Sequence, residues 1–572
     1  MSLRVTTFSS GLTRRHFLVG TAGAASTAGL AALGAAVSFA GTADADAGDD
    51  TGAFLHSVAS GDPLPEAVVL WTRVTPAPDA TPGSGRGAAT TVRWEISTGP
   101  EFSFLTASGE VTTDASLDHT VKVDVGGLSP ATDYHYRFTV LDGPAAGSVS
   151  RTGRTHTAPA PGADPGQLRF AVCSCSNYEA GYFRAYRDLA DRDDLEFTLH
   201  LGDFTYEYAT GEYTAAHGTV VRRVEPAQRT LTLDDFRIRQ GHYHRDADLA
   251  DLLAARPLIA TWDDHEFADN SWREGATGDH EHSGAEFQAL KESASQAYRE
   301  WMPVRDGVLQ RHLRFGTLAE FIIPDLRSYR DEQAAVTATW TGTDNRTLMG
   351  SDQFDWFSDV LTTSDTRWQL IGNQVMFAPM TLPDTLDPRI HDWLVGQIGL
   401  PADGLALNAD QWDGYMAERR RVIDLIVDTK PDGVVFLTGD IHTSWAADIP
   451  VNPGDYRLGR DMRVAATEFI GPSVTAASAF DSIAVSPELD APVLEALQLG
   501  EQIITEVDSW FHYVDLTQHG YLTVDVDADR VRADWYHGSV LTPDAPVTRT
   551  TSYQAVYGAP GVRPVDDGAD GA

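Results

Sequence analysis

The chain has 572 residues, of which 42% are hydrophobic and 9% aromatic. A chain of this length and composition can fill several domain cores, which excludes an intrinsically disordered protein. Its formal net charge of −39 at pH 7 repels nucleic acid backbones and disfavours docking on anionic membranes. We therefore expect no nucleic-acid-binding surface.

Residues 1–45 are predicted to be a twin-arginine signal peptide. The segment "TRRHFLVG" at 13–20 precedes a weakly hydrophobic Ala/Gly stretch and then small residues. A membrane helix fits less well, because Ala and Gly dominate and no strongly apolar run follows. We expect export by the twin-arginine translocase, a secreted extracellular protein and no stable membrane anchor. That route often carries folded proteins that already hold a metal.

Residues 53–160 are predicted to form a small N-terminal β-sandwich. Runs with strand composition at 67–74, 91–98 and 119–125 are separated by Pro/Gly-rich turns. The run "LSPATDYHYRFTV" at 128–140 is similar to one in fibronectin type III-like sandwiches. A linker rich in Pro, Gly and Ala follows at 157–167.

The chain then changes to strand–helix alternation, which predicts a catalytic α/β domain over 168–545 and a C-terminal tail over 546–572. Short, fully apolar runs are typical of strands buried on both faces. Amphipathic helices are expected at 181–192, 284–302, 352–361 and 417–429.

Each of five apolar strands is followed by side chains that can bind a metal. They are Cys173 and Cys175 after 168–172, Asp203 and Tyr206 after 195–201, Asp263 and Asp264 after 256–262, Asn373 after 368–372, and Asp440 and His442 after 433–439. Taken singly, such residues are more often turn or capping residues. Together, we expect them to converge at one sheet edge, where ligands of α/β sheets bind.

The side-chain types favour hard cations. Carboxylates, amides and a phenolate suit Fe(III), Ca²⁺, Mg²⁺ or Mn²⁺. Cys173 and Cys175 are one residue apart, a poor geometry for a mutual disulfide. Either both thiols are buried and inert, or one is a ligand.

Several motifs in this order resemble the alkaline phosphatase D family, metallophosphatases related to purple acid phosphatases. They are "VASGDP…VVLWTRV", "GYF" after the cysteines, "GDFTY", "DDHEFADN", "GNQ" and "GDIHTSW". The likeness covers residues 54 to about 540. It implies an α/β (α+β) metallophosphatase sandwich, with mixed β-sheets flanked by helices, behind an N-terminal fibronectin III-like β-sandwich.

The resemblance also implies Fe(3+) and Ca(2+) as cofactors. Iron would take Cys175, Asp203, Tyr206 and His442. Calcium would share Asp203 and take Asp264, Asn373 and Asp440, with Asn270 as a further candidate. Cys175 is preferred to Cys173 because the family's cysteine lies a fixed short distance before the "GYF" segment.

Two further residues are assigned catalytic roles beside Asp203 and Asp264. His265 is expected to be a ligand, a group behind the ligands or a proton donor. Arg237, in "DDFRIRQ", is expected to clamp phosphate, since arginine suits bidentate contact with an oxyanion. The alternative for Arg237 is a solvated arginine on a helix face.

The resulting prediction is a secreted phosphoesterase that hydrolyses phosphomonoesters and phosphodiesters at alkaline pH, by in-line attack of a metal-bound hydroxide. One alternative is a phospholipase D-type phosphodiesterase that acts on phospholipids with the same site. A less favoured alternative is a non-catalytic, metal-stabilised binding protein. Substrate access is expected to depend on the loops 209–233, 271–283 and 475–500.

Overall fold

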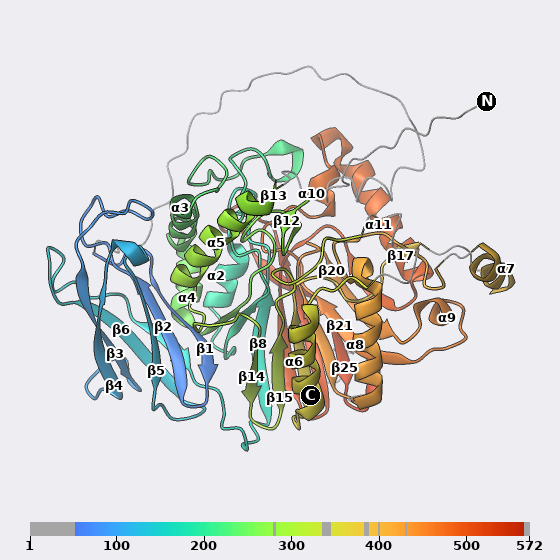
Figure 1. Ribbon diagram of the computed structural model, residues 1–572, viewed down its shortest axis with the longest axis horizontal. Helices are drawn as coiled ribbons and strands as arrows, with labels where there is room; N and C mark the ends of the chain where they lie inside the picture. Colours follow the sequence, from blue (N-terminus) through green and yellow to red (C-terminus); the bar gives the residue numbers. More distant parts are fainter. Residues whose placement is uncertain are drawn as a thin grey trace.

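The computed structural model describes residues 52–277, 282–334, 345–382, 388–398, 401–429 and 432–565. The predicted signal peptide lies outside the described residues. Two large β-sheets pack face to face, and helices cover the outer face of each (Figure 1). The predicted sandwich of mixed sheets flanked by helices is confirmed.

The larger sheet runs through both predicted domains. From edge to edge its ten strands are β26 (Ala559–Pro564), β25 (Val547–Val556), β24 (Arg530–Gly538), β23 (His519–Asp527), β8 (Gln167–Cys173), β9 (Thr198–His200), β10 (Leu258–Ala260), β1 (Val58–Leu64), β2 (Ala67–Arg73) and β5 (Thr120–Gly126). Strands β8, β9 and β10 are parallel, and β23 pairs antiparallel with β8. The sheet is therefore mixed.

The second sheet has seven strands, again with a parallel centre. In order they are β14 (Arg311–Phe315), β15 (Ala319–Ile323), β16 (Trp368–Asn373), β19 (Val434–Thr438), β21 (Val464–Ile470), β20 (Ser444–Pro450) and β22 (Phe511–Asp515). Strands β15, β16, β19 and β21 are parallel neighbours. Two small sheets lie in loops: β11 (Ser271–Trp272), β12 (Gly275–Ala276) and β13 (His282–Ser283), and β17 (Thr381–Leu382) with β18 (Leu405–Ala406).

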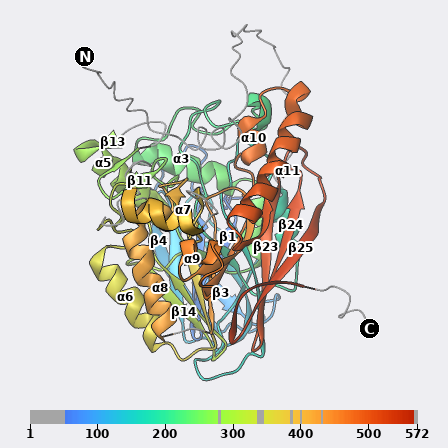
Figure 2. The same cartoon turned by 90° about the vertical axis from the view of Figure 1, so that its right-hand side faces the viewer.

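Helices form the two outer layers. The ten-stranded sheet is covered by α2 (Arg184–Ala190), α3 (Leu233–His244), α4 (Ala247–Ala255) and α5 (Gly284–Trp301), and the seven-stranded sheet by α6 (Gly350–Thr363) and α8 (Met416–Thr429) (Figure 1). The remaining α-helices are α7 (Pro388–Trp393), α9 (Pro453–Arg457), α10 (Ala479–Ile483) and α11 (Asp490–Val507). Figure 2 shows α10 and α11 at the end of the molecule opposite β14. Among the described residues, no helix has the length and apolarity needed to cross a bilayer.

Successive side chains of a strand point to opposite faces of the sheet, and this explains why the two sheets stack. On β8, Leu168, Phe170 and Val172 face the core between the sheets, whereas Ala171 and Cys173 face the helices. Both faces are apolar, as expected for strands buried on two sides. The inter-sheet core is aromatic at its centre, where Phe321 of β15 lies 5.0 Å from Phe170 between ring centroids.

The N-terminal β-sandwich is confirmed, but it is not a separate sheet system. Strands β1, β2 and β5 face the four-stranded sheet β4 (Ala107–Thr113), β3 (Thr90–Ser97), β6 (Asp133–Val140) and β7 (Gly153–His156) across a shared core. The pairing of Gly61 with Leu258 joins β1 to β10 of the large sheet. A Cβ at Gly61 would lie 2.2 Å from the carbonyl oxygen of Pro303, so only glycine fits this join.

Two sequence predictions need correction. Residues 546–564 are not a tail, because β25 and β26 form the outer edge of the ten-stranded sheet. The five ligand-bearing strands do not share one sheet edge either. Strands β8, β9 and β10 belong to one sheet, and β16 and β19 to the other. Period and composition identify buried strands, but not the sheet to which each strand belongs.

We predict that Phe321→Ala lowers the free energy of unfolding by about 3–5 kcal/mol, because it empties the centre of the inter-sheet core. Chemical denaturation followed by intrinsic fluorescence measures the change. Phe104→Ala is the control, since Phe104 is 88% exposed and its removal should change stability little. Equal effects of the two substitutions would contradict this location of the core.

Candidate metal centre

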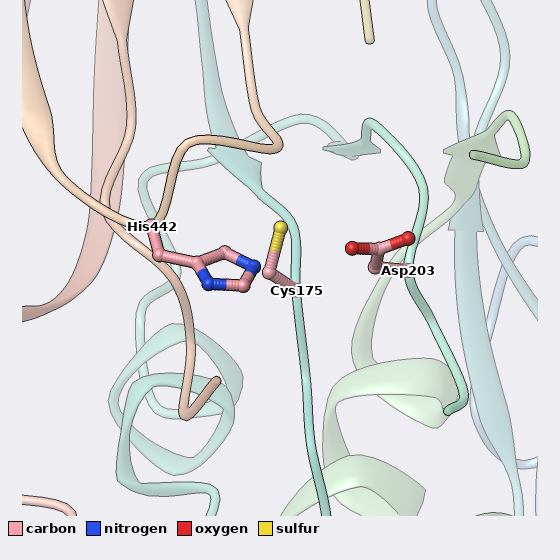
Figure 3. A group of neighbouring side chains, drawn as sticks. All are labelled: Cys175, Asp203 and His442. Carbon is pink, nitrogen blue, oxygen red and sulfur yellow. The ribbon is translucent and has the colours of Figure 1, made fainter. Parts of the chain in front are cut away.

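Asp203 lies at the centre of the candidate site. Three groups of buried ligand atoms, each within 4.8 Å of one another, all include this residue. The groups are Cys175, Asp203 and His442; Asp203, Asp264 and His265; and Asp203, Asp263, Asp264 and Asp440. In Figure 3 the Cys175 sulfur lies between the His442 ring and the Asp203 carboxylate. One carboxylate is thus shared by a thiolate–imidazole end and a carboxylate end of the same centre.

Five of the predicted ligands have the left-handed backbone conformation that non-glycine residues rarely adopt. Their φ angles are 62° for Cys175, 53° for Asp203, 53° for Asn270, 67° for Asp440 and 60° for His442. Such residues persist only where the surrounding structure holds them, and they cluster at functional sites. The backbone here is therefore arranged to aim side chains rather than to continue the strands.

The glycine before Asp203 is required by close packing of two loops. Gly202 has a φ of 106°, and a Cβ there would lie 2.5 Å from the Cβ of Asp263. The loop after β9 can approach the loop after β10 only because this position lacks a side chain. The approach brings Asp203 next to Asp263.

Glu266 holds the same two loops together. Its carboxylate accepts hydrogen bonds from the backbone N–H groups of Asp203 at 3.0 Å, Phe204 at 2.6 Å and Asp263 at 2.7 Å. Burial raises the pKa of Glu266 to about 7, although these hydrogen bonds oppose the rise. A single side chain thus satisfies the amides that flank the shared ligand.

The thiolate–imidazole end also contains Tyr206. Its hydroxyl donates to Asp203 Oδ2 at 3.0 Å and lies 3.2 Å from His442 Nε2. Cys173 lies apart from this group, within the apolar core under the helices, where burial raises the pKa of its thiol. Of the two thiols, the structure brings Cys175 to the candidate centre.

His265 lies beside the thiolate–imidazole end, and Glu207 holds its imidazole ring. Its Nδ1 is 2.8 Å from Glu207 Oε2, and its ring stacks on Tyr206 at 4.3 Å. Burial alone would lower the pKa of His265, but the nearby carboxylates of Glu207, Asp264 and Asp203 outweigh it and raise the pKa well above 6.5. Glu207 therefore fixes the ring and favours its protonated form.

The carboxylate end contains a buried guanidinium. Arg327 contacts Asp263 through Nε, lies 3.3 Å from Asp440 Oδ1 through Nη2, and pairs with Asp410 at 3.0 Å. Burial raises the pKa of Asp263 well above its usual value, with Arg327 opposing and Asp264 adding to the rise. One guanidinium does not balance so many carboxylates, so the group favours further positive charge.

The two predicted amide ligands differ in their surroundings. Asn270 donates its backbone N–H to Asp264 Oδ2 at 2.6 Å. Among the described residues, buried Asn270 Oδ1 and Asp263 Oδ2 accept no hydrogen bond. Asn373 Oδ1 instead accepts one from Trp412 Nε1 at 3.1 Å. Two unpartnered buried oxygens in an acidic group fit the oxygen ligands of a cation.

Comparison with known proteins identifies the family of the chain. The PhoD-like phosphatase family model matches residues 170–535, and the model of that family's N-terminal domain matches 41–159. The chain belongs to the PhoD-like phosphatase family. It is therefore an enzyme that hydrolyses phosphoric esters.

Two proteins that are similar to this chain support the assignment to the family. Alkaline phosphatase D of Bacillus subtilis (strain 168) is 37% identical over 436 residues, which cover 74% of this chain and 69% of that protein. A solved structure described as the structure of PhoD superimposes with a TM-score of 0.76 at 31% identity, covering 91% of this chain and 93% of the other. The fold is thus that of a PhoD-like phosphatase.

Arg237 does not belong to the centre of this PhoD-like phosphatase. Its Nε and Nη2 donate to the two carboxylate oxygens of Glu300 at 2.8 and 2.7 Å, and Nη2 also donates to the carbonyl oxygen of Ser116 at 2.7 Å. The residue is 5% exposed and ties α3 to α5 and to the short helix η1 (Ala115–Leu117). The predicted phosphate clamp and the alternative of a solvated arginine are both wrong.

Sequence analysis missed several residues that support the centre. They are Glu207 behind His265, Arg327 and Asp410 at the carboxylate end, and Tyr213, whose hydroxyl lies 3.2 Å from His442 Nδ1. Arg327 comes four residues after the apolar end of β15, so the strand-end rule applied there would have reached it. Tyr213 carries no such signal, because it lies in a loop.

We predict that Arg237→Ala lowers the free energy of unfolding by about 3–5 kcal/mol, since it leaves the buried Glu300 carboxylate unpaired. Below the melting transition, kcat/KM for a phosphate ester should be unchanged. Arg93→Ala is the control, because its pair with Glu110 is exposed and should contribute under about 1 kcal/mol. A large fall in kcat/KM of Arg237→Ala at normal stability would instead support the prediction that Arg237 clamps phosphate.

Proposed function

We propose that this PhoD-like phosphatase is a secreted phosphoesterase whose activity depends on iron and calcium bound around Asp203. The observation that carries the proposal is the presence of Asp203 in all three ligand groups. A carboxylate shared in this way suits a bridge between two ions. The proposed reaction is hydrolysis of phosphomonoesters and phosphodiesters at alkaline pH.

The side chains at each end suit different ions. Cys175, His442 and Tyr206 with Asp203 offer sulfur, nitrogen and phenolate donors, which suit Fe(III). Asp264, Asp440 and Asn270 with Asp203 offer only oxygens, which suit Ca²⁺. Asn373 remains a proposed calcium ligand, provided that its oxygen exchanges the Trp412 hydrogen bond for the ion. Bound ions would lower the pKa of water and offset charge on the phosphoryl oxygens.

The protein's own residues orient these groups and exclude water. Glu266 sets the backbone of Asp203, and Glu207 holds His265 at Nδ1. Arg327 keeps Asp263 and Asp440 in place at the carboxylate end. His265 lies within the group that contains Asp203 and Asp264. We therefore propose that its protonated ring holds a proton near the reacting ester. No serine nucleophile takes part in this scheme.

The proposed protein is exported and acts on phosphate esters outside the cell. The twin-arginine motif at 13–20 supports secretion and loading of metal before export. Phosphate esters are the proposed substrates, and phospholipid diesters are the alternative to be separated from them by assay. Interaction with the twin-arginine translocase is proposed only for export.

We predict that Asp203→Asn lowers kcat/KM for a phosphate ester by at least about 100-fold. Substitution of residues that only hydrogen-bond to metal ligands usually costs about 10- to 100-fold, and a shared ligand should matter more. Asp203→Asn should also lower bound iron and calcium, measured by inductively coupled plasma mass spectrometry, because the shared carboxylate loses its charge. Asp193→Asn is the control, since Asp193 is exposed and its ion pair is with the exposed Arg154. Full activity and unchanged metal content of the Asp203→Asn variant would contradict the two-ion centre.

The decisive measurement compares initial rates on a phosphomonoester and a phosphodiester at alkaline pH, before and after EGTA, with calcium then restored. We expect EGTA to abolish both activities and calcium to restore them, with the monoester favoured. Preference for the diester would move the assignment to a phosphodiesterase of the phospholipase D type. Absence of turnover on both after metal reconstitution would favour a non-catalytic binding protein.

A further inference from the structure

A cavity of about 280 Å³ lies between two of the predicted access loops, beside the metal centre. One wall comes from the loop around the short helix η2 (Ala216–Gly218), and the other from α10 and the residues next to it. The lining residues that matter here are Tyr213, His217, Ala477, Asp481, Ser482 and Val485.

The cavity adjoins a candidate ligand directly. Tyr213 Oη lies 3.2 Å from His442 Nδ1, and the carbonyl oxygen of Ala477 lies 3.0 Å from the same nitrogen. His442 in turn groups with Cys175 and Asp203. The cavity therefore adjoins the Nδ1 side of His442, next to the candidate centre.

The two walls are held in place by hydrogen bonds. The backbone N–H of His217 donates to the carbonyl oxygen of Ala484 at 2.9 Å, which joins η2 to α10. Ser478 and Asp481 cap α10 reciprocally. A cavity of this volume is slightly below the usual range for drug-sized ligands, so it fits a small alcohol group rather than a long acyl chain.

The lining of the cavity carries little positive charge. No lysine or arginine is among its lining residues. The lining His217 pairs with Asp490 at 2.7 Å, and the lining Asp481 pairs with His519 at 2.8 Å. Burial would raise the pKa of Asp481, but His519 and the Ser478 hydrogen bonds outweigh it and lower the pKa, so this carboxylate stays ionised.

Tyr213 adds an aromatic ring to the lining without adding positive charge. We propose that this cavity is the subsite for the leaving alcohol, and that Tyr213 and Asp481 make it select esters of small cationic or uncharged alcohols over esters of anionic alcohols. The proposal rests on the proposed phosphoesterase function and adds the class of alcohol to it.

The test uses the metal-loaded enzyme and three phosphomonoesters of similar size: 2-aminoethyl, 2-hydroxyethyl and carboxymethyl phosphate. The quantity measured is the ratio of kcat/KM for the aminoethyl ester to that for the carboxymethyl ester at pH 8. Comparing this ratio between proteins cancels the intrinsic reactivity of each ester. We expect Ser482→Lys, which adds a positive charge to the cavity wall, to lower the ratio by about tenfold.

Ser108→Lys is the matched control, since Ser108 is an exposed residue of β4 that does not line the cavity. The control should keep the wild-type ratio. Asp481→Asn should lower the ratio in the same direction as Ser482→Lys, and thermal melting of each variant shows that it is folded. Added salt should weaken the wild-type preference, because screening reduces a charge effect but not a steric one.

An unchanged ratio in both folded cavity variants would overturn the subsite while leaving the phosphoesterase intact. Absence of turnover of all three esters by the wild-type enzyme would instead overturn the phosphoesterase proposal, and the subsite with it. A ratio that falls in Ser482→Lys and Ser108→Lys alike would show an effect of overall charge and would also reject the subsite.

Discussion

The arrangement of the centre depends on the buried carboxylate of Glu266. It accepts three backbone N–H groups, two after β9 and one after β10, and so fixes the loops that carry Asp203 and Asp263. Without such a partner, buried amides at a left-handed residue would be unsatisfied and the loop would relax. Gly202 is the steric counterpart of this constraint, because any side chain there would push the two loops apart.

Electrostatics then explains why the centre calls for cations. Asp203, Asp263, Asp264 and Asp440 converge in a buried space, and Arg327 supplies the fixed positive charge that contacts three of them. Like charges at this spacing are costly in a medium of low dielectric constant unless they are neutralised. The fold therefore holds a buried acidic cluster that bound ions would stabilise, and those ions would supply the positive charge that polarises an ester.

The outer parts of the molecule position this centre in different ways. The N-terminal sandwich continues the ten-stranded sheet through the join of β1 to β10, and the buried Arg237–Glu300 pair connects α3 with α5. On the other side, Tyr213 and Ala477 bring two loops onto His442. A continuous sheet and a buried ion pair thus hold the sandwich side of the molecule, and contacts from two loops hold His442 on the other side.

The sequence by itself determined the buried strands, the β-sandwich, the family and most of the side chains that converge, because apolar periodicity and strand-end motifs are local signals. Only the tertiary structure decided that the five strands belong to two sheets, that β25 and β26 complete one of them, and that Arg237 pairs with the buried Glu300. It also revealed Arg327, Glu207 and Tyr213 around the centre. A strand-end signal reaches Arg327, but its ion pairs, like the contacts of Glu207 and Tyr213, join residues far apart in the chain, and no local pattern encodes them.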